Sequence, residues 1–135
     1  MSDQRRRRIL VVDATTSYVW TVRHRHGDGQ PCREILTLGR DGARIRIVFR
    51  DGEGRSSGGG GYGHSGGVSD REHYLNLHEP GVVRAFVDEA AKRELLERDG
   101  ELDGWELFPA VVRAVALSRA AAATAEAPPD CPPGP

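Results

Sequence analysis

The chain has 135 residues, of which 38% are hydrophobic, 29% charged and 6% aromatic. This is the composition of one soluble domain, since a second independent core would not fit. No window approaches the roughly 18 consecutive apolar residues of a membrane span, and the first apolar run, residues 9–12, is too short for the core of a signal peptide. We therefore expect a cytoplasmic protein that does not associate with membranes.

The net charge of −1 conceals a separation of charge along the chain. Residues 1–56 contain 12 arginines and 7 acidic residues, a net charge of +5, whereas residues 57–135 contain 7 basic and 13 acidic residues, a net charge of −6. Such a separation indicates that the two halves face each other in the fold, that one face is aimed at an anionic partner, or that both are simply solvated.

Alternation of apolar and polar residues predicts a series of strands in the first half of the chain. Residues 1–7 are basic, and we expect them to be disordered, whereas the apolar run at residues 9–12 predicts a first strand. Residues 18–26 and 33–40 alternate in the manner of half-buried strands, because successive side chains of a strand point to opposite faces.

The dipeptide Asp41-Gly42 lies between two alternating runs and predicts a tight hairpin. Both central residues of a type I′ turn need positive φ angles, which this pair adopts readily. Counting outward from the turn pairs Leu38 with Ile45 on one face. A slip of one residue would move Ile45 into water and Arg46 into the core, so burial determines the register.

Glycine and serine dominate residues 51–70, and we expect a flexible loop there. A fifth short strand is predicted at residues 73–77, where apolar and polar side chains alternate again.

Two helices are predicted after this strand. The first begins near Pro80 and runs to about Glu97, with an apolar stripe on one side. Residues 102–107 favour either a short strand or an extended docking segment. A second helix begins at Phe108-Pro109, since proline is tolerated in the first turn, and ends in an alanine- and proline-rich tail, residues 123–135, which we expect to be disordered.

The order of these elements predicts one α+β domain over residues 8–122. Four to five sequential strands favour an antiparallel β-meander, with the two helices packed on one face of the sheet. Strand–helix–strand alternation, which is typical of a parallel sheet, is absent from the sequence.

The glycine-rich segment contains the pattern GxGxxG at residues 61–66, which occurs in loops that cover nucleotide phosphates. The dinucleotide-binding version requires a helix directly after it, and the kinase version a lysine on the next strand, but the chain's one lysine, Lys92, falls in a predicted helix. The group His64, Ser65 and Asp70 also lies here, in a segment too flexible by composition to hold catalytic geometry. We therefore predict no cofactor and no catalytic residue.

A metal site is a weaker alternative. His24 and His26 lie two residues apart on a predicted strand and so share a face, as in metal sites built on sheets. Two ligands do not complete a site, and no third candidate stands at a diagnostic spacing. Cys32 and Cys131 are too far apart in sequence to indicate a zinc motif or a disulfide framework.

Arginines supply the strongest candidate for a binding surface. The predicted register places them opposite the apolar side chains of their strands, so neighbouring strands would combine them on one open face. Acidic residues, among them Glu34, are expected to be interspersed with them. The predicted surface consists of Arg23, Arg25, Arg44, Arg46 and Arg50.

The layout resembles small single-domain hypothetical proteins of GC-rich bacteria to which no activity is assigned. The resemblance covers roughly residues 8–118 and is based on the stretch YLNLHEPGVV that leads into a helix and on the later DGWELF. It implies a compact accessory or partner-binding domain and transfers no catalytic motif.

We therefore expect a non-enzymatic binding or regulatory module that binds a protein partner or associates with itself. Two alternatives stay open: a nucleic-acid-binding protein that uses the arginine face, and a metal-binding protein or small enzyme that uses His24 and His26.

Overall fold

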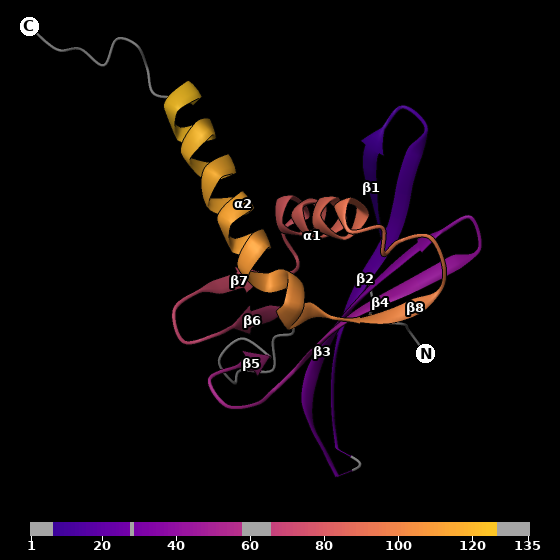
Figure 1. The fold of residues 1–135 in the computed structure, drawn as a ribbon, viewed down its shortest axis with the longest axis vertical. Helices are drawn as coiled ribbons and strands as arrows, with labels where there is room; N and C mark the ends of the chain where they lie inside the picture. The colour runs from indigo at the N-terminus through magenta and orange to yellow at the C-terminus, as the bar shows by residue number, and fades with distance from the viewer. Residues whose placement is uncertain (1–6, 28, 58–65, 127–135) are drawn as a thin grey trace, which may run out of the picture.

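The computed structural model describes residues 7–27, 29–57 and 66–126. A five-stranded sheet with the order β1-β2-β3-β4-β8 forms the main layer, and a three-stranded sheet, β5-β6-β7, lies beside it (Figure 1). Two helices accompany the sheets, so the α+β class is confirmed. The elements are β1 (Arg8–Asp13), β2 (Thr16–Gly27), β3 (Gln30–Arg40), β4 (Ala43–Arg50), β5 (Ser56–Ser57), β6 (Gly67–Ser69), β7 (Tyr74–Asn76), α1 (Pro80–Lys92), β8 (Gly100–Asp103) and α2 (Gly104–Glu126).

Strands β1 to β4 form the predicted antiparallel meander. The turn between β3 and β4 has φ angles of 52° at Asp41 and 84° at Gly42, as a type I′ turn requires. Leu38 pairs with Ile45, and the predicted register is confirmed. Turn geometry and burial therefore favour the same pairing.

This register gives the sheet one apolar face and one arginine-bearing face. On the apolar face, Ile45, Ile47 and Phe49 are at most 1% exposed. The helices cover this face: the ring of Phe49 lies 5.3 Å from those of Phe86 on α1 and Trp105 on α2, both edge-on. Within the described residues no helix covers the opposite face, although Val48 on that face is only 2% exposed.

The last strand and the start of the second helix differ from the prediction. The sequence predicts a short strand or an extended segment over residues 102–107, but the chain divides at Gly104: β8 pairs in parallel with β4, and α2 begins directly afterwards. The sheet is therefore mixed, with β8 as its parallel edge. The helix begins four residues before Phe108 because the Asp103 carboxylate caps it, its Oδ1 accepting the Trp105 backbone N–H at 3.0 Å.

Helix α1 ends at Lys92, and the predicted end near Glu97 is wrong. Glu94 adopts a φ of 61°, in the left-handed region that usually requires glycine. The N–H groups of Leu95 and Glu94 donate to the carbonyls of Ala90 and Ala91, both at 2.9 Å. These two hydrogen bonds end the helix, although the residue in the left-handed conformation is not the glycine usually found there.

The expected loop at residues 51–70 is partly a sheet. Within its described parts, β5 pairs with β6, and β6 pairs in turn with β7, which confirms the fifth predicted strand. Val68 on β6 is completely buried and Leu75 on β7 is 3% exposed, so the small sheet contributes to the core. Residues 58–65 lie outside the described part, as do residues 1–6 and 127–135 of the two predicted disordered ends. The predicted tail begins too early, because α2 continues past residue 122 to Glu126 (Figure 1).

Gly104 lies against Phe49 so closely that an added Cβ would stand 2.3 Å from the ring atom Cε2. We expect Gly104→Ala to lower the free energy of unfolding by about 1–3 kcal/mol, because it overpacks the aromatic core. The matched control is Gly100→Ala, since nothing lies within 4 Å of a Cβ at that position. Urea denaturation checks the difference, and equal stability of the two variants would contradict it.

Candidate functional site: the open face of the sheet

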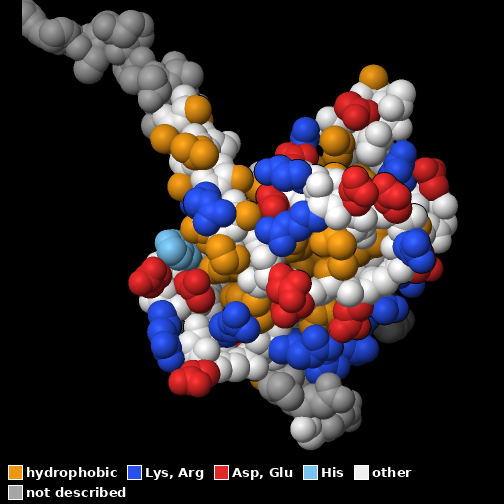
Figure 2. All heavy atoms as spheres, in the orientation of Figure 1, with side chains coloured by type: hydrophobic (Ala, Val, Ile, Leu, Met, Phe, Trp, Pro, Cys, Tyr) orange, Lys and Arg blue, Asp and Glu red, His pale blue; other side chains and the backbone are white. Residues whose placement is uncertain are grey.

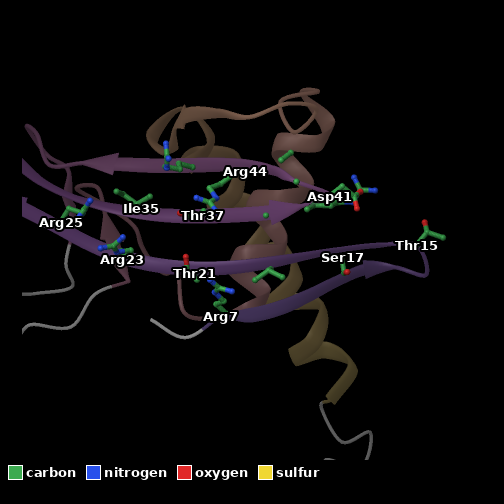
Figure 3. Close-up of a pocket in the computed structure, with 16 residues that line it drawn as sticks. Arg7, Thr15, Ser17, Thr21, Arg23, Arg25, Ile35, Thr37, Asp41 and Arg44 are labelled. Atoms are coloured by element: carbon green, nitrogen blue, oxygen red, sulfur yellow. The ribbon is translucent and has the colours of Figure 1, made fainter. Parts of the chain in front are cut away.

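A hollow of about 800 Å³ lies on the face of the sheet that the helices leave uncovered (Figure 3). Its centre is lined by small side chains, because Val19 pairs with Gly39 and Thr21 with Thr37 on the adjacent strands β2 and β3. Longer arginine side chains surround this centre. The hollow is thus a product of side-chain size: short residues in the two middle strands and long residues around them.

Four of the five predicted surface arginines line this hollow: Arg23, Arg25, Arg44 and Arg46. Arg50 lies farther along β4 and lines a second hollow, of about 550 Å³. Its Nη2 donates to Glu101 Oε2 at 2.8 Å, so this arginine is paired with the acidic strand β8.

The hollow is strongly basic. Its lining contains six arginines and one carboxylate, that of Asp41, which lies 3.6 Å from the Nε atom of Arg40. Within the described residues, no ion pair joins Arg25, Arg44 or Arg46 to a carboxylate. By contrast, the side of the molecule drawn in Figure 2 mixes acidic and basic side chains.

The basic first half and the acidic second half of the chain meet where β4 pairs with β8. Arg46 stands opposite Glu101 in the register of this pair, and Asp99 accepts the backbone N–H of Arg44 at 2.8 Å. The acidic second half of the chain therefore lies beside one edge of the arginine face.

The predicted surface of five arginines omitted Arg33, which shares their face of the sheet but does not line the hollow. Arg33 stands opposite Arg25 on one side and opposite Arg50 on the other, so three arginines form a row across three adjacent strands. The Nη1 atom of Arg33 is buried and has no hydrogen-bond partner among the described residues. The alternation of β3 could have predicted this placement, because Arg33 and Thr37 are both at odd-numbered positions and therefore point to the same face.

Glu34 was expected among the arginines, and this prediction is wrong. It lies on the apolar face, fully buried, because even-numbered positions of β3 point toward the helices. Its Oε1 is hydrogen-bonded to Nδ1 of His24 at 2.9 Å, and its Oε2 accepts the backbone N–H of Gly66 at 2.6 Å. Glu34 thus attaches the glycine-rich segment to the main sheet.

Burial raises the pKa of Glu34 above its ordinary value of 4.5, although the hydrogen bonds from His24 and Gly66 act in the opposite direction. The side chain of His24, one of the two predicted metal-site candidates, is only 24% exposed and lies against Glu34. The side chain of His26 lies outside the described part. Among the side chains that the structure describes, no three His, Cys, Asp or Glu residues are placed to hold a metal ion.

The phosphate-loop pattern at residues 61–66 and the group of His64, Ser65 and Asp70 fall mostly outside the described residues. Asp70 is described, and its Oδ1 accepts the backbone N–H groups of Glu72 and His73 at 2.8 and 2.7 Å. Asp70 therefore closes the turn between β6 and β7.

Comparison with family models, with curated proteins and with solved structures finds no match to this chain. Neither helix, over the residues that the structure describes, combines the length and apolar character that crossing a membrane requires. The functional argument therefore depends on the geometry of the open face.

The raised pKa of Glu34 predicts a specific pH dependence of stability. An acid whose pKa is higher in the folded state contributes stability that is present below its ordinary pKa, near 4.5, and is lost as the pH rises through the raised value. We expect Glu34→Gln, which keeps an acceptor for Gly66, to remove this decline. Glu34→Ala should cost about 1–3 kcal/mol, because it leaves the Gly66 N–H without an acceptor.

Urea denaturation over a pH series from below 4.5 to neutrality measures both effects. The control is Glu53→Gln, because the side chain of Glu53 is 91% exposed and its neutralisation should leave the pH profile unchanged. A profile for Glu34→Gln that matches the unmodified protein would contradict the prediction.

Proposed function

We propose that the protein is a non-enzymatic binding module that holds an acidic segment of a partner protein on the open face of its sheet. The observation that carries this proposal is the basic lining of the hollow, with six arginines and one carboxylate, which continues at Arg25 into the row of Arg25, Arg33 and Arg50. Like charges placed directly opposite each other on adjacent strands destabilise a sheet. A buried guanidinium nitrogen without an acceptor costs further free energy. Glu101 offsets the charge of Arg50 alone, so the remaining positive charge at Arg25 and Arg33 favours an anionic partner.

The composition of the hollow supports a protein partner. Val19 is 43% exposed and Ile35 is partly exposed, so apolar side chains lie at the centre while arginines surround them. Apolar centres with arginine are typical of protein interfaces. A carboxylate-rich segment with a few apolar side chains would match both parts, since carboxylates accept paired hydrogen bonds from guanidinium groups.

Nucleic acid is the second candidate. Phosphate oxygens accept hydrogen bonds from arginine and from hydroxyl groups, and the hollow contains both, the hydroxyls being those of Ser17, Thr21 and Thr37. However, none of the described residues that line the hollow is aromatic, and single-stranded readers use aromatic side chains to stack bases. This candidate is therefore restricted to contacts with a phosphate backbone.

The direct test is affinity capture from a lysate of the organism that encodes the protein, followed by mass spectrometry. We expect the unmodified protein to enrich a partner with an acidic segment and Arg44→Glu/Arg46→Glu to bind it at least about tenfold more weakly, because like charges would then face each other. The matched control is Arg71→Glu/Arg113→Glu, which changes the net charge equally at exposed positions outside the hollow.

A second arm of the test uses labelled duplex DNA and single-stranded RNA in fluorescence anisotropy. Affinity that falls steeply with salt and is lost in Arg44→Glu/Arg46→Glu would favour the nucleic-acid candidate over the protein partner. Failure of the unmodified protein to bind protein or nucleic acid would overturn the proposed function.

Arg33 offers an independent prediction. If the arginine row serves binding, Arg33→Met should raise the free energy of unfolding by about 1 kcal/mol, because it removes the like-charge contacts and the unpaired donor. The same variant should bind the captured partner more weakly. Arg98→Met, at an exposed position outside the sheet, is the control. Thermal and urea denaturation measure the change, and destabilisation by Arg33→Met would argue against a binding role for the row.

A further inference from the structure

Strand β1 is an edge strand whose side chains are apolar on both faces. It stands at the end of the main sheet, with β2 as its neighbour among the described residues, so one side of its backbone has no strand partner there. Leu10 points into the core and is 8% exposed, whereas Ile9 and Val11 on the open face are 70% and 64% exposed. Exposed edges usually carry lysine, proline or inward-pointing charges that block further pairing. The run from Ile9 to Val12 has none of these; the inward-pointing charge of β1 is Arg8 at its start, with Cζ 5.1 Å from the centre of the Trp20 ring.

We propose that β1 pairs in antiparallel orientation with β1 of a second copy of this chain, about a two-fold axis at Leu10. Figure 1 shows β1 at the margin of the sheet, with the β1–β2 hairpin projecting beyond α1. An isologous contact of this kind uses the same surface on both chains. The two sheets would then join into one continuous sheet with all four helices on the same side.

The sequence of β1 is complementary to itself in this register. On the open face, Ile9 lies opposite Val11 of the second copy, and Val11 lies opposite its Ile9. The pairing therefore covers the exposed apolar side chains of the two copies with each other. The register shift of β1 lies between Val11 and Asp13, at the hairpin end, so the regular stretch before it carries the pairing.

Neighbouring registers fail for physical reasons. A shift of one residue would place Ile9 opposite a core-facing residue of the second copy, which a continuous sheet does not allow. A shift of two residues toward the hairpin would place Ile9 opposite the irregular end of the strand at Asp13, and a shift of two residues the other way would place Val11 opposite Arg7. Among these registers, the one centred on Leu10 places both exposed apolar side chains opposite apolar side chains.

The contact is small, and this determines how it would behave. Two six-residue strands bury less than the ~1,200 Å² of a typical stable interface, so we expect a reversible dimer whose fraction increases with protein concentration. Dimerisation would place the two arginine-lined hollows side by side on one surface. The inference does not depend on the proposed function, but it would give an extended partner two contact sites.

Sedimentation velocity over a wide range of concentrations is the first experiment. The unmodified protein should shift from monomer to dimer, and Val11→Lys should remain a monomer, because its charge would face Ile9 of the second copy. The matched control is Leu117→Lys: Leu117 is 72% exposed, but on α2. Monomer at all concentrations for the unmodified protein, or an unchanged dimer in Val11→Lys with a normal circular dichroism spectrum, would overturn the proposal.

Cysteine cross-linking tests the register. In a background with Cys32→Ser and Cys131→Ser, the double variant Ile9→Cys/Val11→Cys should form a reducible dimer, because directly opposite residues approach within disulfide distance. Neither single variant should cross-link. Dimer formation by Ile9→Cys or Val11→Cys alone would show that a residue faces its own copy, and would overturn the register centred on Leu10.

Discussion

The architecture depends on the agreement between the Asp41-Gly42 turn and the alternation of the strands beside it. The turn determines which residues stand opposite each other, and the period of two then assigns every side chain of β2, β3 and β4 to a face. Burial of Ile45, Ile47 and Phe49 against the helices stabilises this arrangement. Because the helices occupy that side, the arginines are confined to the side without a covering layer, and the candidate site is a direct consequence of the core.

The open face carries features that stability alone does not explain. Three arginines stand in one cross-strand row, a buried guanidinium nitrogen of Arg33 has no acceptor among the described residues, and two apolar side chains of β1 are mostly exposed. Each of these features costs free energy in an isolated chain. The acids of β8 offset the positive charge along one edge only. The row and the exposed edge lie on different strands, so they support two separate contacts, one with an anionic partner and one with a second copy.

Glu34 illustrates how an acidic residue can serve the fold rather than the charged surface. Its neighbours Arg33 and Ile35 belong to the open face, but Glu34 itself points inward, where it bridges His24 and the backbone of Gly66. Gly66 has a φ of 104°, and a Cβ there would stand 2.3 Å from the His78 ring, so this position requires glycine. The buried carboxylate and this glycine together join the small sheet to the main one. Its charge suggested a place on the surface. Glu34 points inward because it alternates in step with the buried Leu36 and Leu38 of β3.

The amino-acid sequence by itself determined the meander, the hairpin register, the two faces of the sheet and the start of α1 near Pro80, because turn preference, alternation and proline act between residues close together along the chain. Only the tertiary structure decided that β8 adds to β4 in parallel, that Glu94 ends α1 without a glycine, and that β1 is left at an edge. These outcomes depend on contacts between segments such as 43–50 and 100–103, which are separated by more than a third of the chain. Local pattern does not contain that information, since the free energy of such contacts arises only when the whole core is packed.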